Sequence, residues 1–290
     1  MNYSTNSTNE LYLKSVNWHF WPYCNYKCVF CFANFKELKL HKRNYLNIHE
    51  GKQLLKLLSN HGSEKITFVG GEPLLSPYLP KYLQYSKKLG MLTSIVTNGS
   101  KLNQDFLEKN HQYIDMIGIS IDSTSDMIEK KLGRGRGHHI SHIEKIIPLI
   151  KKYNIKLKVN ITLTKLSINE NFSELLIKWE PDKIKVFQVL GLKGENDKKI
   201  VSLQITDQEF QEFIKRHNTL ELFTETSEMM KGSYVMIDPL GRFFHNTNGY
   251  LEYSDPILDV GIVKAWNQIK FDSKKFVERG GLSYQMLIQK

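Results

Sequence analysis

The stretch "YCNYKCVFC", residues 23–31, contains every cysteine of this 290-residue chain. Cys24, Cys28 and Cys31 lie too close together to form a disulfide framework, and thiolates at such spacing are ligands for a soft metal. Structural zinc and most iron–sulfur clusters take four protein ligands. The stretch therefore raises the question of why three cysteines occur here without a fourth.

Two answers are open on the cysteines alone. A zinc site needs a fourth ligand such as His19 or His41, and neither histidine has the spacing of a zinc finger. If three thiolates hold a [4Fe–4S] cluster instead, one iron has no protein ligand, and a small molecule can bind there and receive an electron. Both answers stay open at this point, and the non-enzymatic one is a metal-stabilised binding protein whose cysteines hold zinc.

The composition is that of a globular protein with a large core. Hydrophobic residues make up 41% of the chain, yet no stretch approaches the roughly 20 apolar residues that a membrane span needs. The first residues are polar and resemble no secretory signal, so we expect a cytoplasmic protein that does not bind a membrane. The formal charge of +10 is compatible with an anionic ligand, but the lysines are spread along the chain as on a solvated surface.

Strands and helices are predicted to alternate through the first 200 residues. A capping box at Asn47 and Glu50 starts one helix, and isoleucines at helical spacing indicate another around Pro148. Strands separated by helices of this length form right-handed crossovers and a parallel sheet. The chain is thus predicted to be an α/β protein with a partial (β/α)6 barrel, whose strands are residues 15–21, 65–69, 92–97, 116–122, 155–163 and 183–190.

The pattern changes beyond the sixth strand. A second capping box, Thr206 and Glu209, opens a helix, and residues 233–246 read as two short strands around a turn at Gly241. No flexible linker precedes this part of the chain. We therefore expect a disordered segment at residues 1–14, the barrel at 15–200, and an extension at 201–290 that packs on the barrel and closes it.

The cysteine motif, together with a glycine motif further along the chain, resembles the radical S-adenosylmethionine (SAM) superfamily. The three cysteines have aromatic neighbours, Tyr26 and Phe32, and "GGEP" at residues 70–73 comes directly after the next strand. The resemblance implies a [4Fe–4S] cluster on Cys24, Cys28 and Cys31, with SAM bound to its open iron and cleaved to a 5′-deoxyadenosyl radical. It also implies SAM contacts from Tyr26, Phe30, Gly70, Gly71, Glu72, Asn98, Ser120 and Arg134, where the Glu72 carboxylate would accept from the SAM ammonium.

Longer segments resemble one family within that superfamily, the viperins of microbes. "KVFQVLGLKGEN", "SYVMID", "ILDVG" and "FVERGG" occur in viperin order, and the resemblance runs from about residue 15 to residue 281. It implies removal of the C4′ hydrogen of a ribonucleoside triphosphate (CTP, UTP or GTP) and loss of the 3′-hydroxyl as water. The 3′-deoxy-3′,4′-didehydronucleotide product terminates viral RNA synthesis, and the electron donor would be a protein such as flavodoxin or ferredoxin.

Polar residues on alternate strand positions fit a triphosphate. In a barrel, one face of each strand points into the lumen, and a buried lysine is costly without an anion. The alternative is that these lysines lie at solvated strand ends. The viperin resemblance places the nucleotide on Asn17, Lys65, Lys158, Asn160, Lys183 and Lys185, although the family usually has arginine at position 183.

One aromatic residue is a catalytic candidate, and two other enzyme classes stay open. Tyr234 matches a viperin tyrosine near the ribose and could supply a proton or hydrogen, although a core tyrosine is an equal alternative. A radical SAM enzyme acting on RNA or another phosphorylated substrate fits the basic charge, but no nucleic-acid module is recognisable, so stable nucleic-acid binding is not expected. Peptide-maturing enzymes usually add later cysteines, which this chain lacks.

Overall fold

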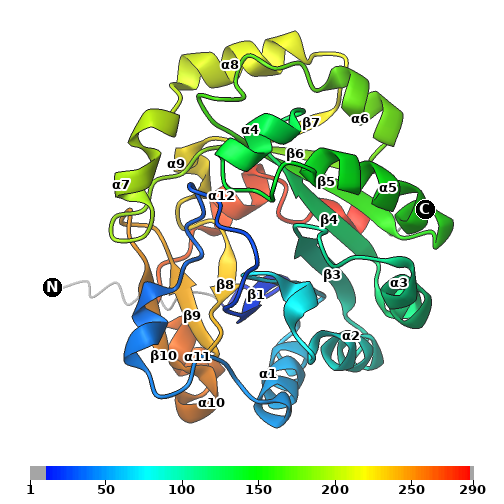
Figure 1. Cartoon of the computed structure of the whole chain (residues 1–290). Helices are drawn as coiled ribbons and strands as arrows, with labels where there is room; N and C mark the ends of the chain where they lie inside the picture. Colours follow the sequence, from blue (N-terminus) through cyan, green and yellow to red (C-terminus); the bar gives the residue numbers. More distant parts are fainter. Residues whose placement is uncertain (1–10, 288–290) are drawn as a thin grey trace, which may run out of the picture.

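A parallel sheet curves around a central lumen in the structure, a computed structural model that describes residues 11–287 (Figure 1). Neighbouring strands pair in parallel and in chain order, which confirms the predicted α/β partial barrel. The six predicted strands are β1 (Ser15–Trp21), β2 (Lys65–Gly70), β3 (Leu92–Thr97), β4 (Met116–Ile121), β5 (Lys156–Leu163) and β6 (Lys183–Gln188).

Helices follow the strands on the outer side of the curved sheet (Figure 1). The capping box predicted for α1 is present, because the Asn47 side chain accepts from the Glu50 amide while the Glu50 carboxylate accepts from the Asn47 amide. Pro148 lies inside α5, the helix that the isoleucine spacing predicted. The helices of this part are α1 (Ile48–Asn60), α2 (Leu79–Lys88), α3 (Gln104–Asn110), α4 (Asp126–Lys131), α5 (His139–Lys152) and α6 (Ser173–Trp179), with 3-10 turns η1 (Lys36–Leu40), η2 (Pro73–Leu75) and η3 (His111–Tyr113).

The rest of the chain adds strands to both edges of the same sheet. β7 (Leu222–Glu225) pairs in parallel with β6, and β8 (Val235–Ile237) pairs in parallel with β1. The predicted hairpin is formed by β8 and β9 (Arg242–His245), and β10 (Glu252–Pro256) completes the order β10-β9-β8-β1-β2-β3-β4-β5-β6-β7. The helices of this part lie before, between and after these strands: α7 (Asp197–Ile200), η4 (Val201–Leu203), α8 (Asp207–Arg216), α9 (Ser227–Met230), α10 (Ile257–Val260), α11 (Ile262–Trp266), α12 (Ser273–Glu278) and η5 (Ser283–Leu287).

Side chains of the C-terminal part close the side of the barrel between β7 and β8. Tyr234, just before β8, donates a hydrogen bond to Glu225 at the end of β7. Arg279, just after α12, donates to the Ser233 carbonyl at 2.9 and 2.7 Å. The lumen is therefore bounded here by side-chain contacts, since no strand pairing joins β7 to β8 in the described part of the chain.

The segment before β1 is partly packed. Leu13 is buried, and the ring of Tyr12 lies 5.9 Å from that of Phe271. Within the segment expected to be disordered, the apolar side chains of Leu11, Tyr12 and Leu13 pack against the core. Residues 1–10 of the expected segment lie outside the described residues.

Alternate strand positions separate the core from the site. On β1 and β2, Trp18 and Phe68 are buried under the helices, whereas Asn17 and Thr67 pair across the strands on the opposite face. Since side chains alternate along a strand, an apolar outer face leaves the polar residues pointing into the lumen. Among the described residues, no helix is long and apolar enough to cross a bilayer.

Candidate active site

A cavity of about 330 Å³ occupies the lumen and is lined by Cys24, Cys28 and Cys31. A smaller pocket of about 70 Å³ adjoins it on the side where the strands begin. Both are lined by Lys158 and Lys185, so the cysteines and the lysines face one connected space. The other residues shared by the two linings are Asn17, Thr67 and Tyr234.

Two glycine motifs clamp the cysteine loop. The amide of Gly71 donates to the Trp21 carbonyl at 2.6 Å, and a Cβ at Gly71 would lie 2.2 Å from the Tyr23 oxygen. On the other side, the Lys27 amide donates to the Gly133 carbonyl at 3.1 Å. "GGEP" and "GRGRG" therefore hold the loop by backbone contacts that a side chain would prevent.

The three thiols are only half-exposed and lack strong donors. Cys24 Sγ accepts from the Tyr26 backbone amide at 3.3 Å and lies 3.8 Å from Nδ2 of the Asn98 side chain. Burial raises the pKa of all three thiols, and it raises that of Cys28 to about 12 despite the nearby Arg134 charge. These thiols become thiolates beside a strong positive charge, which bound iron provides.

The donor set fits a cluster better than a single ion. A lone metal ion needs donors that converge on one point, and within residues 11–287 no three histidine, cysteine or acidic side chains are placed to hold one. An iron–sulfur cluster offers each thiolate a separate iron, so three thiols that face one cavity suit it. The zinc alternative, with His19 or His41 as the fourth ligand, has no support in this geometry.

Glu72 lies inside the wall and not in the cavity lining, which Gly70 and Gly71 do form. Its carboxylate accepts from Thr97 Oγ1 at 2.6 Å and from the Asn98 amide at 2.8 Å. Burial raises the pKa of this carboxyl, and these hydrogen bonds oppose the rise. The arrangement ties "GGEP" to "TNGS" and does not fit the expected direct contact of the Glu72 carboxylate with the SAM ammonium.

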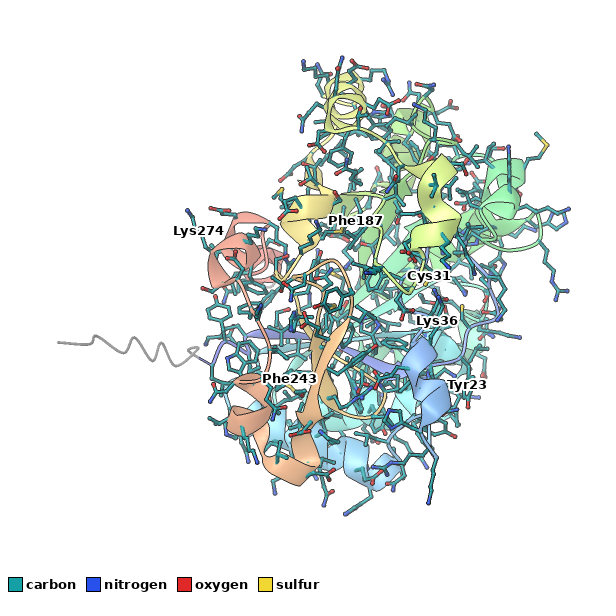
Figure 2. All side chains as sticks on the ribbon, turned by 90° about the vertical axis from the view of Figure 1, so that its left-hand side faces the viewer. Tyr23, Cys31, Lys36, Phe187, Phe243 and Lys274 are labelled. Carbon is teal, nitrogen blue, oxygen red and sulfur yellow. The ribbon has the colours of Figure 1, made fainter. Side chains whose placement is uncertain are left out.

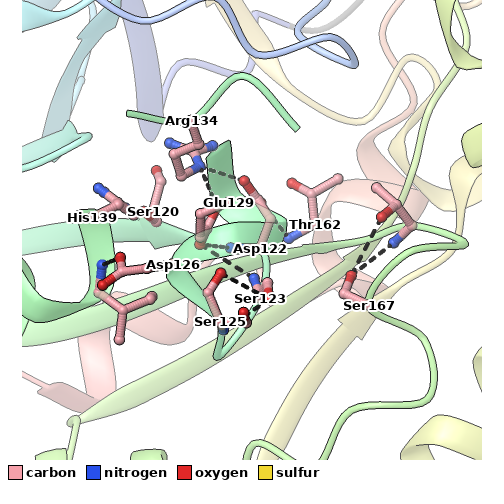
Figure 3. Close-up of polar contacts among 12 residues, drawn as sticks. Ser120, Asp122, Ser123, Ser125, Asp126, Glu129, Arg134, His139, Thr162 and Ser167 are labelled. Carbon is pink, nitrogen blue, oxygen red and sulfur yellow. Dashed lines mark hydrogen bonds and ion pairs between the residues drawn. The ribbon is translucent and has the colours of Figure 1, made fainter. Parts of the chain in front are cut away.

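Arg134 reaches the cavity from the loop after α4, and the buried side chains of Asp122 and Glu129 lie beside its guanidinium (Figure 3). Its Nε donates to Asp122, and Glu129 Oε2 lies 3.6 Å from the same nitrogen. Burial opposes the charge, but Asp122, Cys28 and Glu129 together raise the pKa of the guanidinium above its usual range. A fixed cation at the wall beside the cysteines is suited to a ligand carboxylate.

The remaining residues predicted to contact SAM surround the same space. Tyr26 packs edge-on against the His139 ring, whose Nε2 donates to the Ser120 carbonyl at 2.9 Å. The Asn98 side chain donates to Asn25 at 3.0 Å, and the Phe30 ring centre lies 5.9 Å from the Arg134 guanidinium. Every residue predicted for SAM lines the cavity except Glu72.

Five cations line the smaller pocket. Burial first, and then mutual repulsion, lowers the pKa of Lys65 to about 7, and that of Lys158 well below its ordinary value. Burial likewise lowers the pKa of Lys183 and Lys185 to about 8. Buried lysines with lowered pKa values carry full charge only beside anions. The four lysines together therefore indicate a polyanionic ligand. The fifth cation is Arg279.

The predicted nucleotide residues do not all have the same surroundings. Lys183 lines only the smaller pocket, where it donates to Ser283 and lies 4.0 Å from the Phe223 ring centre. Asn160 Oδ1 is buried without a hydrogen-bond partner in the structure, as expected of a ligand-binding group. Gly118 makes room for the Lys158 side chain, because a Cβ at Gly118 would lie 2.8 Å from Lys158 Cε.

Tyr234 is tied into this pocket by three charged residues. Its hydroxyl donates to Glu225 and accepts from Lys185 Nζ at 3.0 Å, and the Arg279 guanidinium lies 3.5 Å from its ring centre. Glu225 also pairs with Lys185 and lies 3.6 Å from Arg279 Nη1. Burial raises the pKa of Tyr234 well above its ordinary value, so the phenol keeps its proton.

Sequence reasoning missed Arg279 and Glu225 as site residues, and it considered His19 only as a zinc ligand. Arg279 lies in "FVERGG", a segment of the viperin resemblance, so the sequence did carry a signal for it. Glu225 has no local signal, because its role depends on contact across the barrel. His19 lines the larger cavity with Nδ1 unpartnered, and burial lowers its pKa to about 3, so the ring is neutral.

Residues 18–176 match the sequence model of the Radical SAM superfamily, and the chain belongs to that superfamily. Its cofactors are SAM and a [4Fe–4S] cluster. Within the superfamily the chain belongs to the S-adenosylmethionine-dependent nucleotide dehydratases, which confirms the viperin resemblance.

Three relatives with this name illustrate how similar the chain is to the family. A protein of that name from Flammeovirga pacifica is 41% identical over 93% of this chain and 95% of its own length. One from Siniperca chuatsi is 36% identical over 94% of this chain and 79% of its length. For a relative from Lacinutrix mariniflava, 42% identical, the chain spans only 58% of the length.

Solved structures confirm the fold alone. Streptococcus suis SuiB bound to S-adenosylmethionine has a TM-score of 0.69 and 17% identity, and the match covers 93% of this chain and 67% of SuiB. The enzyme anSMEcpe with bound AdoMet and a peptide has a TM-score of 0.68 and 16% identity, covering 93% of this chain and 83% of that one.

Proposed function

We propose that this protein uses a SAM-derived radical to dehydrate a ribonucleoside triphosphate to its 3′-deoxy-3′,4′-didehydro form. The observation that carries the proposal is the connection between the two pockets. A cavity with three thiols shares Lys158, Lys185 and Tyr234 with a pocket of five cations. The names of the relatives, which describe nucleotide dehydratases, support the same reaction.

We assign the cofactors to the larger cavity. Cys24, Cys28 and Cys31 would hold the cluster, which when bound supplies the electron that cleaves SAM to methionine and a 5′-deoxyadenosyl radical. Arg134 binds the SAM carboxylate, since its charge is fixed by Asp122. Tyr26, Phe30, Gly70, Gly71, Asn98 and Ser120 form the rest of the SAM site, and Glu72 shapes it from behind.

We assign the triphosphate to the lysine pocket and the ribose to the space between this pocket and the larger cavity. Lys65, Lys158, Lys183 and Lys185, together with Arg279, neutralise the phosphates, whose negative charge restores the lysine charges that burial suppresses. Asn17 and Asn160 lie on the same lumen face and orient the sugar. The ribose C4′ then lies between the radical source and Tyr234.

Tyr234 assists the departure of the 3′-hydroxyl. After the C4′ hydrogen is removed, the C3′–O bond breaks and the hydroxyl takes a proton and leaves as water. One electron then completes the C3′=C4′ double bond. Because the Tyr234 phenol is protonated and held by Glu225, it is a suitable source of that proton, or of the proton and the electron together as one hydrogen atom.

The wider roles belong to the same proposal. The substrate is CTP, UTP or GTP, and a small carrier such as flavodoxin or ferredoxin supplies electrons. A product without a 3′-hydroxyl terminates RNA chains, which gives the enzyme an antiviral or antiphage role in the cytoplasm. Residues 15–200 act as the catalytic barrel and residues 201–290 as the extension that closes it over the substrate.

The test is anaerobic incubation of reconstituted protein with dithionite, SAM and each of the four ribonucleoside triphosphates, followed by mass detection. We expect a product one water lighter from one or more pyrimidine or guanine nucleotides. Cys28→Ala should yield neither this product nor 5′-deoxyadenosine. If the wild-type protein cleaves SAM but dehydrates only an RNA oligonucleotide, the triphosphate assignment is wrong.

A further inference from the structure

We propose that the outer side of the cysteine loop is the docking surface for an acidic one-electron carrier protein. The inference rests on the proposed function, because the carrier delivers the electron that SAM cleavage uses. Three segments build this surface: the loop itself, α4 with the loop after it, and α7 with η4. We call it the cluster-loop face, and it comprises Lys27, Met127, Lys130, Lys131, Arg136, Lys198, Lys199 and Val201.

The three segments are packed together as one unit. Phe30 of the cysteine loop forms a buried apolar cluster with Leu132 and Ile200, against which Cys28 and Val29 pack. Backbone bonds attach the loop to the segment after α4, with the Val29 amide 2.9 Å from the Leu132 carbonyl. On the α7 side, Asn196 donates to the Phe30 carbonyl at 2.6 Å.

The cysteine loop itself reaches the surface of the molecule. Cys28 and Cys31 are half-exposed, and Lys27 is exposed beside them. Figure 2 shows Cys31 between α7, drawn in yellow-green, and Lys36 of η1. Electron transfer slows steeply with the thickness of the intervening protein. A carrier bound at the cluster-loop face would therefore transfer its electron faster than one bound on the outer helices of the barrel.

The face carries positive charges without partners. Its six cations are exposed, and in the described part of the chain none of them forms an ion pair. Elsewhere on the surface, Lys156 and Lys165 pair with Asp182 and Glu209. The nearby acids are already engaged, since Asp126 caps the start of α5 and Asp197 accepts from the Gly194 amide. A concentrated positive field of this kind attracts an acidic protein and orients it.

Apolar side chains lie among these charges. Met127 on α4 is 79% exposed and Val201 after α7 is 72% exposed, the two largest values among the exposed large hydrophobic residues described. Exposed apolar residues rimmed by charges are typical of protein–protein contacts and are not expected of a surface that only binds phosphate. The combination points to a protein partner rather than to nucleic acid.

The chemistry of delivery is a single electron transfer. The carrier is oxidised by one electron and the cluster is reduced by one, with no bond made or broken. A flavin or iron–sulfur protein with an acidic face around its redox group has the required charge and stoichiometry. Each turnover of SAM needs the carrier to bind and leave, so contacts of modest affinity with a charged rim are suitable.

The test compares two triple variants of the reconstituted holoenzyme. The face variant is Lys130→Glu, Lys131→Glu, Lys199→Glu. The control is Lys56→Glu, Lys88→Glu, Lys264→Glu, whose lysines are also exposed and unpaired among the described residues but lie on α1, α2 and α11. We measure 5′-deoxyadenosine formation with reduced flavodoxin and with dithionite, and flavodoxin affinity by calorimetry.

With flavodoxin, the face variant should lose about tenfold or more in rate and affinity and most of its salt dependence, because three attractive charges become repulsive. The control should behave like the wild type, and all three proteins should have equal rates with dithionite. A second variant, Met127→Ser with Val201→Ser, should weaken flavodoxin binding while the salt dependence persists.

Equal loss in the face and control variants would overturn the docking surface, and so would binding of an RNA oligonucleotide that depends on the face while flavodoxin binding does not. These readouts use SAM cleavage and carrier binding, neither of which requires a dehydrated nucleotide. Failure of the proposed dehydration therefore leaves the test of the docking surface intact.

Discussion

The hydroxyl of Tyr234 donates its hydrogen bond to Glu225 across the side of the barrel that no strand pairing closes. Lys185 Nζ lies 3.0 Å from the same phenol oxygen and also pairs with Glu225. The phenol is thus held in one orientation at the boundary between the cysteine cavity and the lysine pocket. This contact joins β7 to the segment before β8, so one residue pair both closes the lumen and places the candidate catalytic group.

Removal of the phenol hydroxyl should separate radical formation from dehydration. In Tyr234→Phe, the ring still packs under Arg279, so 5′-deoxyadenosine should continue to form with dithionite and SAM. The dehydrated nucleotide should fall by about 100-fold, the usual contribution of a positioned proton donor. The ratio of the two products, measured by mass spectrometry, checks this. An unchanged ratio would make Tyr234 a core residue.

Triphosphate binding should weaken as the pH rises from about 7 to 9. In the free protein the pKa of Lys65 is about 7 and those of Lys183 and Lys185 are about 8, so these groups lose their protons in this range. A triphosphate favours the charged forms, so its binding takes up protons, and affinity falls by up to about tenfold per pH unit for each lysine concerned.

Calorimetry in two buffers of different ionisation enthalpy measures that proton uptake directly. The control ligand is the matching nucleoside, which lacks phosphates and should bind without pH dependence. Proton release on triphosphate binding, or equal pH dependence for nucleoside and triphosphate, would contradict the placement of the phosphates among the lysines.

Affinity for SAM should depend on Asp122 more than on Glu129. Asp122 accepts from Arg134 Nε and from the Thr162 amide at 3.0 Å, so Asp122→Asn removes the charge that orients the guanidinium (Figure 3). We expect SAM to bind about tenfold more weakly, as for loss of a charge-assisted pair. Burial and the Asp122 charge raise the pKa of Glu129, so Glu129→Gln resembles its protonated form and should bind SAM nearly as well. Equilibrium dialysis checks both, and the reverse order would refute the assignment.

Loading of iron should be sensitive to one glycine of "GGEP". A Cβ at Gly71 would lie 2.2 Å from the Tyr23 backbone oxygen, so Gly71→Ala must displace the cysteine loop. We expect the iron content after anaerobic reconstitution to fall by at least about half, with a matching loss of absorbance near ~400 nm. Gly62→Ala is the control: Gly62 also has an unusual backbone (φ +83°), but no atom lies within 4 Å of the added Cβ. It should cost about 1 kcal/mol of stability and leave iron loading unchanged.

Much of the barrel could be predicted because its signals are local. The capping boxes at Asn47 and Thr206 depend on residues three positions apart, and both are present. Strand β1 has the predicted bounds, since its apolar residues alternate with Asn17 and His19. The order of the added strands could not be derived in this way, because pairing of β8 with β1 joins residues more than 200 positions apart.

The candidate site was predictable to the same degree. The cysteines and glycines form a recognisable motif, and the lysines follow the alternation of β5 and β6. The role of Glu72 was not predictable, because whether a carboxylate faces a cavity or caps a neighbouring loop depends on where Thr97 and Asn98 lie. Lys183 likewise reaches Ser283, which no periodicity relates to it.

The sequence by itself determined that three thiols share one loop and that the strands carry lysines on one face, because spacing and alternation are properties of the covalent chain. Only the tertiary structure decided that Arg279 completes the lysine pocket, that the buried Glu225 pairs with Lys185 and lies beside Arg279, and that the pocket opens onto the thiols. The physical reason is that Arg279 and Glu225 come from segments far apart in the chain, and they meet only when the extension packs across the open side of the sheet.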